Sequence, residues 1–121
     1  KAFLFTGDIE FEAEEDISHL GRWLKSDVMK VPHHGAKTSA DEVFFREVSP
    51  QVAVVTAGRL NSAMKQALKD TEILLTGIVG AVKVEERNTG LRIKTYREFM
   101  FKKTRHLSGE LHNIKRLFTV W

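Results

Sequence analysis

Three side chains that could bind a metal ion follow two short apolar runs of the sequence. Asp8 comes shortly after the run at residues 2–6, and His33 and His34 come directly after Pro32, which ends the run at residues 28–31. Short runs rich in Val, Leu and Phe that stop at Gly or Pro are typical of buried parallel strands. In an open α/β sheet, functional side chains collect where such strands end. We therefore expect Asp8 and one of the two histidines to share one rim of a sheet.

Each of these residues also has an ordinary structural interpretation. Asp8 is a good N-cap residue for a following helix. Adjacent histidines in an extended or turning segment point in opposite directions, so only one of them can face a metal. We favour His33 as the ligand, because it directly continues the strand, and keep His34 as the alternative. Gly35 then allows the backbone to turn sharply beside the site.

Four further residues are candidates for contacting a substrate. Lys37, Thr38 and Ser39 precede a predicted helix, where backbone N–H groups and an ammonium suit a phosphate oxygen. Arg59 follows the next predicted strand and could face the same rim. The structural alternative is that Ser39 caps the helix, because a glutamate at position 42 completes a capping-box pattern, and that Lys37 is simply exposed.

The elements that must position these residues alternate between strand and helix. The residue pattern predicts an amphipathic helix at residues 10–24, which Gly21 could end a turn early, and a second helix that Ser39 opens and that runs to about residue 48. Asn61 is the predicted cap of a third helix. Alternating residues around a three-residue loop at 88–90 predict a hairpin. The remaining predicted strands and the third helix are at residues 51–56, 73–75 and 62–69.

The last part of the chain carries a single apolar stripe. Leu107, Leu111, Ile114 and Phe118 recur at helical spacing, which predicts a helix at residues 106–118. We therefore divide the chain into a half-domain at residues 1–97 and an amphipathic helix within residues 98–121. That helix either covers a bare sheet face or pairs two chains, and we expect a homodimer.

Composition narrows the class of protein. With 121 residues, 42% hydrophobic and 29% charged, the chain is typical of one globular domain or part of one, and it begins inside a predicted strand without Met, as a fragment would. It has no cysteine, so a metal would need His and carboxylate ligands. The net charge of +3 is unevenly spread, with acidic residues at 8–16 and mostly basic ones from Arg87 onward. A basic end can attract phosphate backbones, although most such runs are a solvated face.

Three segments together resemble a known family. Thr6-Gly7-Asp8, residues 24–39 (LKSDVMKVPHHGAKTS) and residues 48–59 (VSPQVAVVTAGR) are similar to the second half of a metallo-β-lactamase-fold domain. More narrowly, they resemble the C-terminal hydrolase-like domain of ComEC-type competence proteins, the DNA-uptake channels. The resemblance spans residues 3–96. It implies an α/β fold, namely the second half of a metallo-β-lactamase-like αββα sandwich (β-α-β-α-β-α-β plus hairpin), to which the C-terminal helix is an addition.

The resemblance also implies a function. In the family, the aspartate of Thr-Gly-Asp bridges two divalent metals, so Asp8 and His33, or His34 as the alternative, would hold Zn or Mn in the full-length parent. The implied activity is metal-dependent, nuclease-like hydrolysis of phosphodiesters. The implied partners are single-stranded or double-stranded DNA and the remainder of a membrane-embedded parent. The implied location is bacterial, in a soluble domain of an inner-membrane protein on the extracytoplasmic side.

Two family features are absent from the sequence. The His-x-His-x-Asp-His type cluster that precedes Thr-Gly-Asp is not present, and no His-Pro follows Arg59. One carboxylate and one imidazole fall short of the roughly six donors of a dinuclear site. We therefore expect this chain alone to be inactive and to hold no metal tightly. The alternative is a non-catalytic DNA-binding or structural domain of the uptake channel, which would use its basic C-terminal half to hold single-stranded DNA.

Overall fold

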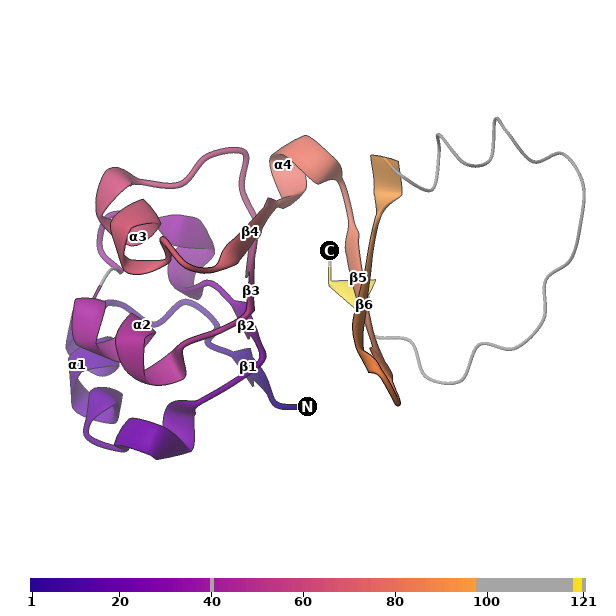
Figure 1. Cartoon of the computed structure of the whole chain (residues 1–121). Helices are drawn as coiled ribbons and strands as arrows, with labels where there is room; N and C mark the ends of the chain where they lie inside the picture. Colours follow the sequence, from indigo (N-terminus) through magenta and orange to yellow (C-terminus); the bar gives the residue numbers. More distant parts are fainter. Residues whose placement is uncertain (40, 98–118, 121) are drawn as a thin grey trace, which may run out of the picture. The chain divides into compact units, whose positions relative to one another are not determined.

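The structure is a computed structural model, and it describes residues 1–39, 41–97 and 119–120 (Figure 1). The chain divides into two compact units, Lys1–Ile78 and Val79–Trp121. The predicted helix at residues 106–118 and its apolar stripe lie outside the described residues. The division at residue 97 and the homodimer stay predictions.

The first unit is built on a parallel sheet of four strands. The strands lie in the order β1-β2-β3-β4, and β2 pairs with both β1 and β3. All four residues of β3 and the first two residues of β2 are buried, and valine recurs among them. Such β-branched side chains fit a pleated surface that is covered. This confirms the α/β class and the parallel arrangement. The strands are β1 (Phe3–Phe5), β2 (Val28–Lys30), β3 (Val52–Val55) and β4 (Glu72–Leu75).

The helices α1, α2 and α3 lie on one face of this sheet, as Figure 1 shows. The predicted helix at residues 10–24 is two elements in the structure, because Gly21 adopts a left-handed conformation with φ +51°. A left-handed residue cannot continue an α-helix. The helices are α1 (Phe11–Ser18), the 3-10 helix η1 (Gly21–Leu24), the 3-10 helix η2 (Pro32–Gly35), α2 (Glu42–Val48), α3 (Ser62–Ala67) and α4 (Thr76–Val79).

An apolar core joins the helices to the sheet. Phe44 and Phe45 of α2 are buried, and their rings meet edge to face with centroids 5.4 Å apart. Each fully buried side chain of this size stabilises the fold by roughly 1.5–3 kcal/mol. The ends of the strands are therefore held on a rigid scaffold. The other buried members of the core are Leu24, Met29, Val31, Val48, Ala53, Val55, Leu60, Met64 and Leu68.

The caps of two helices test the predicted boundaries. Asn61 caps α3, because its side chain accepts a hydrogen bond from the N–H of Met64 at 2.9 Å, as predicted. The predicted cap of α2, Ser39, is wrong. Asp41 caps α2 instead, and its carboxylate accepts bonds from two backbone N–H groups of the first turn. The hydroxyl of Ser39 is buried and donates to the buried carboxylate of Glu14, which needs donors there.

The described part of the second unit is an antiparallel hairpin. The strands β5 (Val82–Arg87) and β6 (Gly90–Thr95) pair from Val82 with Thr95 to Arg87 with Gly90. The loop therefore has two residues, and the predicted three-residue loop is wrong because Gly90 still pairs. The short strand β7 (Thr119–Val120) lies antiparallel to β5. None of the helices among residues 1–39 and 41–97 combines the length and apolar character needed to cross a bilayer.

Candidate functional site

Asp8 and His34 lie side by side at the carboxyl edge of the sheet. The exits from β1 and β2 are joined by a hydrogen bond from the Thr6 hydroxyl to the carbonyl of Lys30, at 2.7 Å. The N–H of His33 donates to the carbonyl of Gly7 at 3.2 Å. As a result, Asp8 Oδ1 and His34 Nε2 are 3.6 Å apart. The structure thus brings together one carboxylate and one imidazole.

The two histidines occupy a strained turn. His33 and His34 both have left-handed backbones, with φ 41° and 54°, and Gly35 follows with φ 79°. A non-glycine residue held in this region costs about 1–3 kcal/mol, and such strain gathers at functional sites. The turn spreads the two rings, whose centroids are 6.5 Å apart at an interplanar angle of 62°. The imidazoles therefore have different neighbours.

His34 is held from both sides of its ring. Its Nδ1 lies 2.5 Å from the hydroxyl oxygen of Thr56, which follows β3, and its Nε2 faces Asp8. Its side chain remains 55% exposed. A partner on one ring nitrogen fixes the orientation of an imidazole and leaves the other nitrogen directed at a ligand. One ring nitrogen of His34 thus has a hydroxyl partner, and the other faces a carboxylate.

His33 belongs to a second cluster. Its Nδ1 lies 2.9 Å from Glu10 Oε1 and 3.2 Å from the hydroxyl of Thr38. That hydroxyl in turn donates to Glu10 at 2.9 Å. Of the two histidines that the sequence left open, the one beside Asp8 is therefore His34, the alternative, and His33 is placed beside a glutamate instead.

Lys30 brings a positive charge to the same edge. Its ammonium lies 3.6 Å from Asp8 Oδ1 and donates to the carbonyl of Gly7 at 3.0 Å, with the side chain 14% exposed. A cation at this place attracts anions to the edge.

The four predicted substrate-binding residues are placed differently from one another. Thr38 joins the cluster of Glu10 and His33. Ser39 is buried and directed toward α1, away from solvent. Lys37 and Arg59 are exposed. Contact of these four residues with a substrate stays a prediction.

Sequence reasoning missed Glu10, Lys30 and Thr56. Thr56 ends a predicted strand, as Asp8 nearly does, so the same pattern could have revealed it. Lys30 is a charged residue inside an apolar strand, which is itself a signal. Glu10 carried no local signal, because it is one acidic residue among several.

The implied metal fits this edge in donor type but not in donor number. Carboxylate and imidazole are ligands of Zn²⁺ and Mn²⁺. A zinc site usually has three or four protein ligands. Within the described ranges, however, no three His, Asp or Glu side chains are close enough together to hold one ion. Asp8 and His34 are therefore two side chains of suitable type, fewer than a zinc site usually has.

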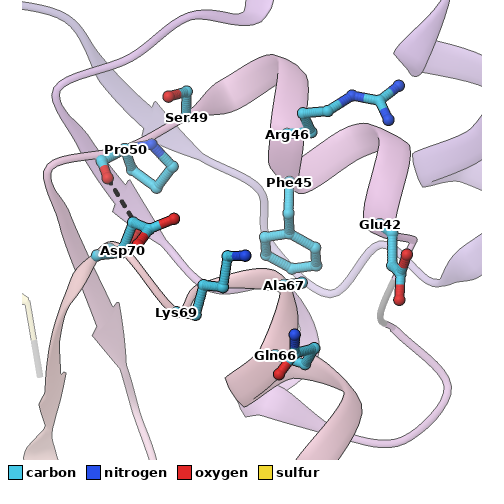
Figure 2. Close-up of a pocket in the computed structure, with 10 residues that line it drawn as sticks. Glu42, Phe45, Arg46, Ser49, Pro50, Gln66, Ala67, Lys69 and Asp70 are labelled. Atoms are coloured by element: carbon cyan, nitrogen blue, oxygen red, sulfur yellow. Dashed lines mark hydrogen bonds between the residues drawn. The ribbon is translucent and has the colours of Figure 1, made fainter.

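A cavity of about 400 Å³ lies at the opposite edge of the sheet (Figure 2). Pro50 and Thr71 precede β3 and β4, and the Thr71 hydroxyl donates to the carbonyl of Pro50 at 3.0 Å. The cavity is thus separate from Asp8 and His34, because these two residues lie after the carboxyl ends of their strands. Its other lining residues include Glu42, Phe45, Arg46, Gln66 and Lys69.

Comparison with known proteins identifies relatives of the chain. No family model matches it, and no solved structure matches it. It is 30% identical over 88 residues to ComE operon protein 3 of Bacillus subtilis, covering 73% of this chain and 11% of that protein. It is 30% identical over 109 residues to competence protein ComA of Neisseria gonorrhoeae, covering 83% of this chain and 16% of that protein.

A third relative is recombination protein 2 of Haemophilus influenzae, 44% identical over 59 residues, which are 48% of this chain and 7% of that protein. The chain thus spans between 7% and 16% of the length of these three relatives. The residues of this chain belong to the family of ComEC-type competence proteins and correspond to one segment of them.

Proposed function

We propose that this segment is part of a metal-dependent, nuclease-like hydrolase domain of a bacterial DNA-uptake protein. The observation that carries the proposal is the separation of 3.6 Å between Asp8 Oδ1 and His34 Nε2 at the carboxyl edge of a parallel sheet. The names of the relatives, which refer to competence and recombination, support a role with DNA. The metallo-β-lactamase-like sandwich is the fold that we propose for the complete domain.

Each residue of the edge has a proposed task. Asp8 and His34 are two of the metal ligands, and Thr56 orients the ring of His34 through Nδ1. Lys30 attracts the phosphate group of the substrate to the edge. A divalent ion at such a site supplies Lewis-acid stabilisation of the charge that develops during phosphodiester hydrolysis. The other ligands come from elsewhere in the full-length parent.

The parent defines the proposed partners and location. We propose DNA, single-stranded or double-stranded, as the substrate and the membrane-embedded remainder of the parent as the partner. The domain then lies on the extracytoplasmic side of the inner membrane.

The metal content of the full-length parent after soaking in Zn²⁺ or Mn²⁺, with each substitution made in the parent, tests the ligand assignment. Asp8→Ala and His34→Ala are expected to lower the bound metal, whereas His33→Ala is expected to retain it, because His33 faces Glu10. Asp16→Ala and His19→Ala are matched controls, since both residues are exposed on or just after α1. Equal metal content in all five variants would contradict the assignment.

Nuclease activity of the full-length parent tests the function. Asp8→Ala in the parent is expected to abolish metal-dependent cleavage of DNA, while this chain alone is expected to be inactive. Cleavage that survives both Asp8→Ala and a chelator would overturn the proposal.

A non-catalytic DNA-binding or interaction domain is the second candidate. The observation that favours it is that, within the described residues, no three His, Asp or Glu side chains are close enough together to hold one ion. Binding of DNA that persists in chelator, in a parent without nuclease activity, would support this candidate.

A further inference from the structure

The register of the β5–β6 hairpin gathers positive charge on one of its faces. Alternate residues of a strand share a face, and directly paired residues of antiparallel strands lie on the same side. Lys83 pairs with Lys94, and Glu85 pairs with Arg92, so these four side chains share one face with Arg87. We call this set the basic face. The opposite face carries Val82, Val84, Leu91 and Ile93.

The basic face holds four cations against one carboxylate. That excess equals the net charge of the whole chain, +3. The side chains of Arg87 and Lys94 are 49% and 42% exposed, and Arg92 is exposed as well. The second glutamate of the hairpin, Glu86, lies on the opposite face, so the positive charge of the hairpin is confined to the basic face.

Glu85 organises the cations around it. Its carboxylate lies 2.5 Å from the ammonium of Lys83, 2.9 Å from the guanidinium of Arg87 and 3.9 Å from the ammonium of Lys94. Hydrogen bonds from Lys83 and Arg87 lower the pKa of Glu85 to about 2. The network restrains long side chains that would otherwise lose conformational entropy on binding an anion.

An exposed aromatic side chain directly follows β6. Tyr96 is helical and lies just beyond the last paired residue of the hairpin, and its N–H donates to the carbonyl of Ala81 at 2.8 Å. Tyr96 is 53% exposed. It lies close to Gly80, where a Cβ atom would come within 2.8 Å of Tyr96 Cβ. Exposed aromatic rings of this kind are platforms on which nucleobases stack.

These features fit single-stranded nucleic acid better than a membrane surface. A membrane-binding surface combines cations with apolar side chains that enter the lipid. The paired positions of the basic face carry only charged residues and Gly90. A row of cations beside an aromatic ring is the combination with which proteins hold single strands, through phosphates and stacked bases.

We propose that the basic face binds the phosphate backbone of single-stranded DNA, with Tyr96 stacking on a base. The choice of DNA rests on the proposed function, but the binding surface lies in the second unit and requires no metal. Its failure can therefore be separated from failure of the metal site.

Binding of a fluorescent single-stranded oligonucleotide in EDTA, at several salt concentrations, tests the proposal. A face that neutralises roughly three phosphates gives a slope of about −2 for log K against log salt concentration. The variant Arg87→Gln, Arg92→Gln, Lys94→Gln is expected to bind about tenfold or more weakly at low salt, with a slope near zero. The matched control is Arg46→Gln, Lys65→Gln, Lys69→Gln, which removes the same charge from α2, α3 and the residues after α3 and should bind like the unaltered chain.

Two single substitutions separate binding from a merely structural ion-pair network. Glu85→Gln removes the carboxylate of the basic face, so the affinity for DNA should rise by several-fold. If the ion-pair network were purely structural, the substitution would change the stability of the protein but not its affinity for DNA. Tyr96→Ala should weaken binding by roughly fivefold or more, and Tyr96→Phe should restore it. Arg92→Gln alone serves as the charge test where the triple variant does not fold.

Three results would overturn the inference. They are unchanged binding in the triple variant, an equal loss in the matched control, and binding to phosphatidylserine vesicles without binding to the oligonucleotide. Asp8→Ala is expected to bind the oligonucleotide normally. If Asp8→Ala abolished binding in EDTA, DNA would be held at the sheet edge and not on the hairpin.

Discussion

The carboxylate of Asp8 and Nε2 of His34 are 3.6 Å apart, although the two residues follow different strands of the sheet. Parallel pairing of β1 with β2 brings their carboxyl ends to one edge, and the left-handed turn at His33 and His34 aims one ring back at Asp8. The pair is thus a product of both topology and local backbone conformation.

Removal of the hydroxyl of Thr56 should weaken metal binding without removing a ligand. Thr56→Val keeps the shape of the side chain but deletes the partner of His34 Nδ1. Loss of such a partner typically lowers metal affinity by about 10–100-fold. Isothermal titration of the full-length parent with Zn²⁺ measures this, and Thr56→Ser should restore the affinity. Equal affinities in the Thr56→Val parent and the unaltered parent would show that Thr56 does not orient His34.

Gly35→Ala should destabilise the first unit strongly. A Cβ atom at Gly35 would lie 2.7 Å from Leu60 Cδ1 and 3.2 Å from Val55 Cγ1, and φ is +79°. Overpacking and the left-handed backbone together cost about 2–4 kcal/mol. Gly7→Ala is the matched control, because Gly7 has φ +60° but a Cβ atom there would meet no other atom within 4 Å. This variant should lose only about 1–2 kcal/mol of the free energy of unfolding. Urea unfolding measures both, and equal losses would rule out the steric contribution.

Glu14→Ala should loosen the loop before α2. The buried carboxylate of Glu14 accepts bonds from the hydroxyl of Ser39 and, at 2.8 Å, from the N–H of Asp41. Unpaired buried donors cost about 2–3 kcal/mol of the free energy of unfolding. Glu15→Ala, on the exposed side of the same helix, should change it by no more than about 0.5 kcal/mol. Similar values for the two variants would mean that the buried bonds contribute nothing net.

The stabilising contribution of Glu85 should depend on pH. The folded-state pKa of Glu85 is lowered from 4.5 to about 2, so the ionised form is favoured in the folded chain. Its contribution is therefore present above pH 4.5 and is lost as the pH falls toward 2. The difference in unfolding free energy between the unaltered chain and Glu85→Gln, measured at pH 7, 4 and 2.5, should shrink across that range. A constant difference would contradict the ion-pair assignment.

Features that depend on local pattern were predictable from the sequence. The parallel strands follow from short apolar runs that end at Gly or Pro, and the Asn61 cap follows from residue type and position. The cap of α2 was missed because Asp41 and Ser39 are both suitable by type, and only the buried carboxylate of Glu14 decides between them.

Features that depend on tertiary packing were not predictable. Glu10, Lys30 and Thr56 reach one edge from three different parts of the chain. The orientation of His34 depends on positive φ angles at two non-glycine residues, which strand alternation does not foresee.

The turn at His33 and His34 lowers the stability of this chain. Glycine, or asparagine to a lesser degree, occupies left-handed backbone at a lower energetic cost than histidine does. Replacement of either histidine by glycine should therefore make the polypeptide more resistant to unfolding. A chain optimised for stability alone would carry glycine at these positions, so the two histidines are kept at an energetic cost that the fold itself does not require.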